Sequence, residues 1–327
     1  MAEPAASAVP PRGLLDHALD WRWGLPLLAL LVALPFLAPL LGGDFYVGLA
    51  ARILIYALAA TSLNLILGFG GMVSFGHAAF VGVGAYTAGL LLQAGVTSAW
   101  IGWPLAMAVA ALFAWGIGAI SLRTRGVYFI MITLAFAQML YYLAVSGKAW
   151  GGDDGLPLPG RATLGPGLDL ADERTFYWVT LALATLAFIG IWRLLNARFG
   201  HVLQAARENE VRMEAIGFAV YRYKLTAFVI AGALAGLAGA LLASLGSFVS
   251  PSLMQWHQSG LLMVMVILGG VGHLWGGVIG AVVFLLLEEV LSHYTIYWQF
   301  VLGALLLAVV LVAPNGLMSL FRGRGRP

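Results

Sequence analysis

The sequence predicts an all-α fold: a polytopic integral membrane helical bundle of about ten transmembrane helices, or eight to nine, with glycine-broken segments. Composition is the first observation, since 61% of the residues are hydrophobic, 9% are charged and the mean hydropathy is +0.94. These values lie far outside the range of a soluble domain of 327 residues. The other two observations are charge-free runs long enough to cross a bilayer and glycine-rich interruptions inside them.

The charge-free runs set the number of spans. About 20 apolar residues cross the ~30 Å hydrocarbon layer, so each short run holds one span. Residues 53–122 have room for three spans, and residues 225–287 hold one span and then an apolar stretch with a glycine-rich break at 269–277. The runs are residues 23–43, 53–122, 126–147, 175–192, 225–287 and 290–321. Cutting the chain at 269–277 gives ten spans, and leaving it uncut gives nine.

The distribution of basic residues favours ten spans. Lys and Arg near span ends accumulate on the cytoplasmic side of a membrane. With ten spans and the N-terminus inside, thirteen of the seventeen Lys and Arg residues face the cytoplasm, whereas nine spans give ten inside and six outside. We therefore expect both termini in the cytoplasm and a cytoplasmic-side turn or broken helix in the region of residues 275–277.

The remaining segments frame a single transmembrane domain at 24–320. Residues 1–23 form a cytoplasmic leader, and residues 321–327 form a cytoplasmic basic tail. Residues 147–174 are a Gly- and Pro-rich loop on the outer side, and residues 193–224 are the largest cytoplasmic loop. The leader does not resemble a signal peptide, so we expect the first span to stay in the mature protein.

The second span has two possible starts. It begins near Phe45, which buries Arg52 in the helix and ends the span near Leu67, or it begins near Arg52 and continues to about Gly71. The second choice lets the arginine reach the outer headgroups.

Few residues in the chain could carry out chemistry. The chain has no cysteine and no G-x-x-x-x-G-K-[ST] motif, so it lacks a thiolate metal site and the usual phosphate cradle, and it does not hydrolyse ATP on its own. Asp153 and Asp154 are either a pair for a divalent cation or a solvated acidic turn. Glu288 and Glu289 are expected to cap the outer end of a span. The net charge of +3 follows from the cytoplasmic bias and does not indicate nucleic-acid binding.

The cytoplasmic loop at 193–224 carries six basic residues, three glutamates and several apolar residues. Its pattern predicts a short amphipathic helix over 204–216, with Gly217 as the C-terminal stop. Two interpretations stay open. The loop is a solvated connection lying on the lipid headgroups, or it is a docking helix for a cytoplasmic partner, because it exposes an apolar stripe rimmed by charge.

Several separated motifs resemble those of the branched-chain amino-acid ABC importer permeases, and the resemblance runs from about residue 45 to 320. The matching stretches are LNLILGFGGMVSFGHAAF at 63–80 with GVGAY at 82–86, GGDDGL at 151–156, RENE at 207–210 with EAIG at 214–217 and YKL at 223–225, and LGGVGHLWG at 268–276. The GGDDGL loop favours the LivM-type subunit over its LivH-type partner.

The resemblance implies half of a translocation pore for the branched-chain amino acids Leu, Ile and Val. Such a permease pairs with a homologous LivH-type subunit, two cytoplasmic ATPase subunits bind ATP and Mg²⁺, and a periplasmic amino-acid-binding protein delivers the cargo. The chain itself is then not an enzyme and holds no cofactor or metal. It is expected to be a multi-pass protein of the bacterial inner membrane.

Two sets of site residues follow from the resemblance. A zwitterion that crosses hydrocarbon needs dipoles in place of lost water, held weakly enough to permit release. The expected substrate pathway consists of Asn64, Gly70, Gly71, Ser74, His77 and Gln138. The expected ATPase-coupling residues are Arg207, Glu208, Asn209, Glu210, Glu214 and Gly217. His77 has a second interpretation, as a packed histidine that is hydrogen-bonded to a neighbouring backbone.

Three alternative functions stay open. Related permeases of the same class carry urea, amides or other small carboxylates. A self-sufficient secondary carrier or channel would need no ATPase, but proton-coupled carriers need ionisable groups deep in the bundle, and only His77 and His273 lie in the middle of apolar runs. An intramembrane enzyme would depend on Asp153 and Asp154.

Overall fold

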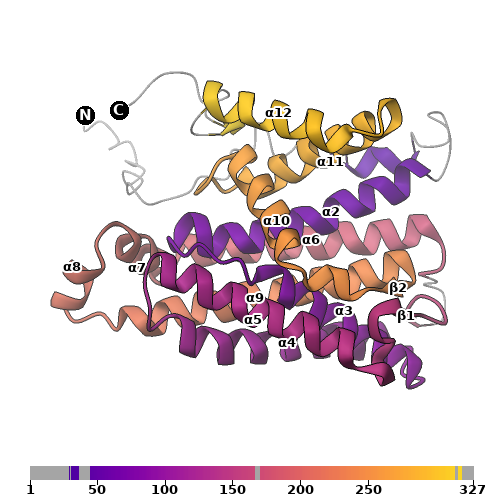
Figure 1. The fold of residues 1–327 in the computed structure, drawn as a ribbon, viewed down its shortest axis with the longest axis horizontal. Coiled ribbons are helices and arrows are strands. Elements are labelled where there is room, and N and C mark those ends of the chain that lie inside the picture. The colour runs from indigo at the N-terminus through magenta and orange to yellow at the C-terminus, as the bar shows by residue number, and fades with distance from the viewer. Residues whose placement is uncertain (1–28, 30, 37–44, 166–169, 314–315, 319–327) are drawn as a thin grey trace, which may run out of the picture.

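The chain folds as a bundle of helices (Figure 1). The computed structural model describes residues 29, 31–36, 45–165, 170–313 and 316–318. The predicted leader at 1–23, the basic tail at 321–327 and most of the first predicted span lie outside these residues. The labelled helices are α2 (Phe45–Asn64), η1 (Leu65–Phe69), α3 (His77–Gln93), α4 (Ala99–Ser121), α5 (Val127–Ser146), η2 (Lys148–Trp150), η3 (Gly152–Asp154), α6 (Glu173–Asn196), α7 (Arg198–Glu208), α8 (Glu210–Ala215), α9 (Val220–Gly246), η4 (Pro251–Met254), α10 (Trp256–Gly269), α11 (Gly276–Tyr294) and α12 (Trp298–Val312).

Six of the described helices are long and apolar enough to cross a membrane, namely α2 with η1, α4, α5, α6, α9 and α11. Helices α3, α10 and α12 have 17, 14 and 15 residues. Their lengths of about 21–26 Å fall short of the ~30 Å hydrocarbon layer. The prediction of a polytopic helical membrane protein is confirmed. Two of the three short helices, α3 and α10, adjoin the glycine breaks described below.

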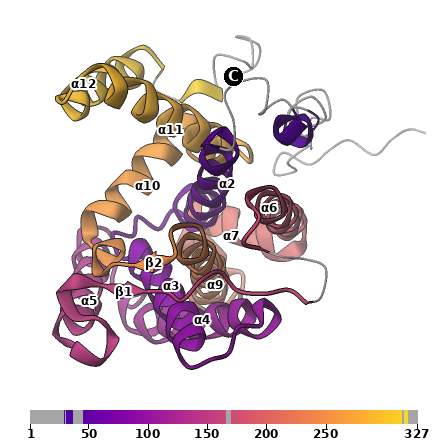
Figure 2. The ribbon, with the colours of Figure 1, turned by 90° about the vertical axis from the view of Figure 1, so that its right-hand side faces the viewer.

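Helix α9 lies at the centre of the bundle and packs on both α3 and α4 (Figure 2). Small residues allow this close packing. A Cβ atom added to Gly236 would lie 3.0 Å from the carbonyl oxygen of Ala106 in α4, and one added to Gly84 in α3 would lie 2.5 Å from the Cα of Gly236. Such contacts between backbones are typical of membrane helices, where small residues replace the hydrophobic driving force of water.

Helix α2 begins at Phe45, so the first of the two predicted starts is confirmed, and the span continues through η1. Arg52 therefore lies within the helix, where its Nη2 is 3.1 Å from Oε1 of Glu288 in α11. The expectation that Glu288 and Glu289 cap the end of a span is wrong, because α11 continues to Tyr294. An acidic partner for Arg52 explains a carboxylate at this depth, since an unpaired charge in an apolar span is costly.

The two ends of the bundle are built differently (Figure 1). Helices α7 and α8, from the predicted cytoplasmic loop, form one end. The predicted outer loop forms the other end, where β1 (Leu156–Pro157) pairs antiparallel with β2 (Phe248–Val249). Helices α10, α11 and α12 follow one another along one side of the bundle, with α11 packed on α2 (Figure 2).

Candidate functional site

The first glycine break lies between α2 and α3. After Asn64 the helix widens into the π-helix η1, and residues 70–76 form no regular helix before α3 begins at His77. Gly71 has φ of +67°, a left-handed conformation that glycine adopts without steric cost. Because π-helical turns inside α-helices are frequent at functional sites, this break is a candidate site on geometry as well as on sequence.

The second break separates α10, which ends at Gly269, from α11, which begins at Gly276. Gly270 and Gly272 have φ of +120° and +77°, so the chain reverses through two left-handed residues. The predicted interruption of the apolar stretch at 269–277 is therefore confirmed, and its placement on the cytoplasmic side stays a prediction.

Asn64 joins the two breaks. Its Nδ2 donates to the carbonyl oxygen of His273 at 2.8 Å, and its Oδ1 accepts from the backbone N–H of Gly272 at 3.1 Å. A Cβ atom at Gly68 would lie 2.5 Å from the Gly272 nitrogen, so glycine is required for this approach. We call this contact between Asn64, Gly68, Gly272 and His273 the break junction. Its two hydrogen bonds join residues that are 208 and 209 positions apart in the sequence.

Helix α7 reaches the break junction through Arg207, whose Nη1 donates to the carbonyl oxygen of Gly68. The helix is held against the bundle along its length, because Val202, Leu203 and Ala206 are buried. The cytoplasmic segment predicted from the sequence is therefore part of the packed structure and touches the first glycine break directly.

The prediction of one helix over 204–216 is wrong, because the segment forms two helices. Asn209 is extended, with φ of −154° and ψ of 98°, and separates α7 from α8. Its Oδ1 accepts from the backbone N–H of Arg212 at 2.9 Å, so the asparagine starts a new helix as an N-cap. Gly217, with φ of +93°, follows the end of α8 as predicted.

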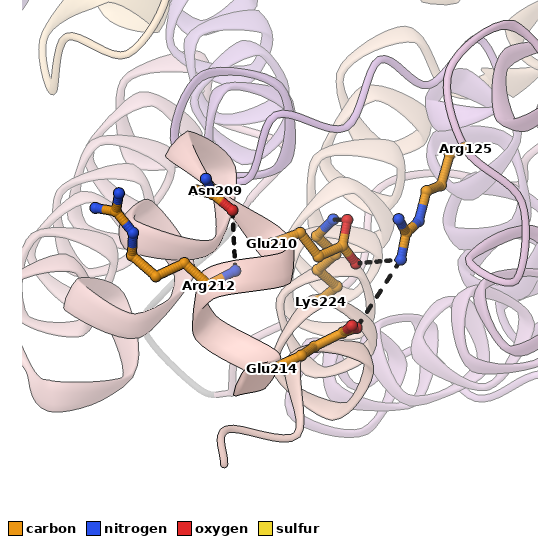
Figure 3. Close-up of polar contacts among 6 residues, drawn as sticks. All are labelled: Arg125, Asn209, Glu210, Arg212, Glu214 and Lys224. Carbon is orange, nitrogen blue, oxygen red and sulfur yellow. Dashed lines mark hydrogen bonds and ion pairs between the residues drawn. The ribbon is translucent and has the colours of Figure 1, made fainter. Parts of the chain in front are cut away.

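An ion network, formed by Arg125, Glu210, Glu214 and Lys224, fastens α8 to the bundle (Figure 3). Oε2 of Glu210 accepts from Nζ of Lys224 at 2.9 Å, and Oε1 lies 3.6 Å from Nη2 of Arg125. The same Nη2 lies 3.9 Å from Oε1 of Glu214. Exposed ion pairs contribute about 0–1 kcal/mol each. The side chain of Arg212 points away from this network (Figure 3).

A cavity of about 270 Å³ lies between the ion network and the first break. Gly70 and Gly71 line one part of it, and Arg125, Arg207 and Lys224 line another. Ala206 and Glu210 line it as well, and its remaining walls come from the α4–α5 connection, α5 and the chain after Gly71. Sequence reasoning missed Arg125 and Lys224 as members of this site, although both were already assigned to the same side of the membrane by their charge.

The predicted pathway residues do not share one surface. Gly70 and Gly71 line the cavity, whereas Asn64 is 1% exposed and lies in the break junction. Gln138 is half-buried on α5 and does not line the cavity.

Ser74 and His77 are fully buried. Nε2 of His77 lies 2.8 Å from Oγ of Ser62, which itself donates to the carbonyl oxygen of Ala59. Because the Ser62 hydroxyl already donates to Ala59, Nε2 of His77 acts as the donor toward Ser62, and its Nδ1 has no hydrogen-bond partner among the described residues. Oγ of Ser74 accepts from the backbone N–H of Gly76 at 3.2 Å. Neither side chain offers surface to a substrate in this conformation.

The two aspartates of the predicted outer loop are exposed. Asp153 and Asp154 lie on η3, and within the described residues no group of three or more His, Cys, Asp or Glu side chains could hold a metal ion. The short helix forms where Gly151, Gly152 and Gly155 all have positive φ, so the GGDDGL motif corresponds to a tight turn.

Comparison with known proteins decides the family. Residues 45–310 match the family model described as the permease component of the branched-chain amino acid transport system. The chain belongs to this permease family. The matched range covers α2 to α12 almost entirely, and with them both glycine breaks, the ion network and the cavity.

Individual relatives agree with this assignment. The high-affinity branched-chain amino acid transport system permease protein LivM of Salmonella typhimurium is 30% identical over 319 residues, which cover 90% of this chain and 74% of that protein. LivM of Escherichia coli K12 matches to the same extent. LivH of Escherichia coli K12 is 26% identical over 284 residues, which cover 81% of this chain and 91% of that protein. The resemblance to LivM-type permeases is thereby confirmed. No solved structure matches the chain.

Proposed function

We propose that this permease forms half of the translocation pore of an ATP-driven importer for Leu, Ile and Val. In this proposal it pairs with a LivH-type subunit in the inner membrane of a bacterium, with both termini in the cytoplasm. Two ATPase subunits dock at the α7–α8 end, and a periplasmic amino-acid-binding protein docks at the opposite end. The names of the relatives, which are permeases of both the LivM and the LivH type, support the pairing and the cargo.

The observation that carries the proposal is the surface of α8 and the residues after it. Val211 and Ile216 are 67% and 63% exposed at the end of the bundle, although α8 itself is fastened by three ion pairs. Exposed apolar side chains on a fixed, charge-rimmed element are typical of a protein–protein contact. Docking of an ATPase subunit here would cover both side chains.

The opposite end supports the docking of a second partner. The loop before α6 is held in place by Arg161, whose Nη2 lies 3.3 Å from Oε1 of Glu173 and whose Cζ lies 5.0 Å from the centre of the Phe176 ring. The β1–β2 pair ties the same loop to the chain after α9. This structured surface is suited to receive a binding protein that delivers the amino acid.

Substitutions on α8 test the docking of the ATPase subunits. We expect Val211→Asp and Ile216→Asp to lower the amount of ATPase that co-purifies with the permease pair by about tenfold, because truncating or charging a central contact costs about 1–2 kcal/mol or more. Arg193→Gln is the control, since it removes a charge from an exposed side chain at the end of α6, outside α8. Equal co-purification of all three variants would contradict docking at α8.

Reconstitution in liposomes separates the importer from the self-sufficient carrier. We expect uptake of radiolabelled leucine only when the ATPase subunits, ATP and the binding protein are all present. Uptake by the permease pair alone, driven by an ion gradient, would favour the secondary carrier. Unlabelled compounds are then added to compete with the uptake of radiolabelled leucine. Competition by Ile and Val favours the branched-chain amino acids as cargo, whereas competition by urea, acetamide or propionate favours the other cargo classes.

A further inference from the structure

Arg207 contacts both glycine breaks at once, although it belongs to the segment that docks the ATPase in the proposed function. Its Nη1 donates to the carbonyl oxygen of Gly68 in the first break. A Cβ atom on Gly71 would lie 3.0 Å from Cγ of Arg207, and one on Gly272 in the second break would lie 3.1 Å from its Nη1. The side chain therefore lies against backbone from segments that flank the break junction on two sides.

Glycine is needed at these positions for two separate reasons. Gly71 and Gly272 have φ of +67° and +77°, which other residues adopt only with strain. A side chain at either position would also press on Arg207. Because Gly71 and Gly272 have no side chain, Arg207 can lie directly against their backbone, and the contact depends on both the arginine and the glycines.

The acceptor of Arg207 is a carbonyl at the end of a helix. Gly68 belongs to η1, the last turn of the α2 span, where carbonyl groups lose their intrahelical donors. A cation near such a helix end is favourable because the aligned peptide dipoles make that end negative. Arg207, which belongs to α7, supplies both the hydrogen-bond donor that the Gly68 carbonyl lacks within its own helix and a positive charge at that helix end. This explains why the guanidinium turns toward the bundle.

The cavity of about 270 Å³ gives this contact room to change. Arg207 lines the cavity together with Glu210 and the two glycines at 70 and 71. A displacement of α7 therefore has open space beside it, and the bonded Gly68 backbone can move together with the guanidinium.

We propose that Arg207 is a positioning residue for transport, which fastens α7 to the break junction so that movement of α7 shifts both glycine breaks together. This inference rests on the proposed function, since α7 moves only if an ATPase acts on it. It also changes the predicted role of Arg207, from a contact with the ATPase to an internal connection between the docking segment and the interrupted spans.

Three variants of the complete complex test the inference in liposomes. We expect Arg207→Gln to lower the number of leucine molecules imported per ATP hydrolysed by about fivefold or more, the usual range of a coupling free energy of 1–3 kcal/mol. ATP hydrolysis and co-purification of the ATPase should stay within about twofold of the parent complex. Arg207→Lys should give an intermediate ratio, because lysine keeps the charge but lacks the planar fork of donors. Arg193→Gln, at an exposed arginine of α6 outside the docking helix, should leave the ratio unchanged.

Each other outcome overturns the inference. If Arg207→Gln releases the ATPase subunits, the residue is a partner contact. If the ratio of import to hydrolysis stays at the parent value, the linkage does not transmit movement. If both Arg207 variants fail to show the parent thermal transition in detergent, the role is structural only. Failure of the proposed function is distinct, because the parent complex would then import leucine without the ATPase subunits.

Discussion

Replacing Asn64 with Ala should destabilise the break junction measurably. The substitution removes two hydrogen bonds, to His273 O at 2.8 Å and from Gly272 N at 3.1 Å. Side-chain hydrogen bonds inside membrane proteins contribute about 0.6 kcal/mol on average and up to about 1.7 kcal/mol. Two bonds to a side chain that is 1% exposed therefore correspond to about 1–3 kcal/mol, or roughly 5- to 140-fold in the unfolding equilibrium constant.

Asn64→Asp gives a sharper test of the same geometry. The carboxylate keeps an acceptor for the Gly272 N–H but places a charged oxygen against the His273 carbonyl, where the amide donated. We therefore expect Asn64→Asp to destabilise the protein at least as much as Asn64→Ala at neutral pH.

Unfolding in mixed micelles, followed by the fluorescence of the 11 tryptophans, measures both variants. Gln138→Ala is the control, because it removes the same kind of amide from a half-buried helix position with no hydrogen bond to the described residues. A parent-like midpoint for Asn64→Asp, or equal losses for Asn64→Ala and Gln138→Ala, would refute the reasoning.

Two other predictions concern single positions outside the candidate site. Gly239→Ala in α9 should destabilise the protein by about 1–3 kcal/mol, because the new methyl group would overlap the carbonyl of Val81 in α3. Gly246→Ala in the same helix places its methyl group in open space, so this variant should be neutral or slightly stabilising. Thermal unfolding in detergent compares the two variants. Asp172 caps α6 by accepting from Thr175, and these hydrogen bonds lower the pKa of its carboxyl below 3.8. The stability that the ionised Asp172 cap contributes is fully present above the pKa of the unfolded state, and it is lost as the pH falls through the lower pKa of the folded state. Asp172→Ala should therefore lower the free energy of unfolding by about 1 kcal/mol at pH 7 and by less at pH 3. Unfolding midpoints measured at both pH values check this, and an equal loss at both would contradict it.

Local features of the fold were predictable from the sequence. Glycine runs inside apolar stretches indicated both breaks, because such runs neither favour helix nor fill a lipid-facing surface. The charge of 193–224 indicated a segment at the end of the bundle, and Gly217 indicated where its helical part ends. These predictions depend on composition within windows of a few residues.

The contacts between distant segments were not predictable from one sequence. Asn64 reads as a polar residue in a span, and nothing in its neighbourhood indicates that both ends of its amide bind Gly272 and His273. Glu288 was expected at a span end and Arg52 either within a span or at its start, and only their separation of 3.1 Å shows that they pair inside two helices. The division of 204–216 at Asn209 was missed because a capping residue inside an amphipathic pattern looks like one more polar position.

The division at Asn209 separates two parts of the docking segment that are attached to the bundle in different ways. Helix α7 is attached by buried apolar side chains and by the contact of Arg207 with Gly68, which are insensitive to salt. Helix α8 is attached by ion pairs of Arg125, whose side chain is 65% exposed, by the part-buried pair of Lys224 with Glu210, and by the buried side chain of Met213. The exposed pairs of Arg125 are weak and screened by salt, so high salt should loosen these contacts of α8 before it loosens the contacts of α7. In the proposed importer, a partner that moves α8 would move α7 with it, and the contact of Arg207 with Gly68 would carry that movement to the first glycine break.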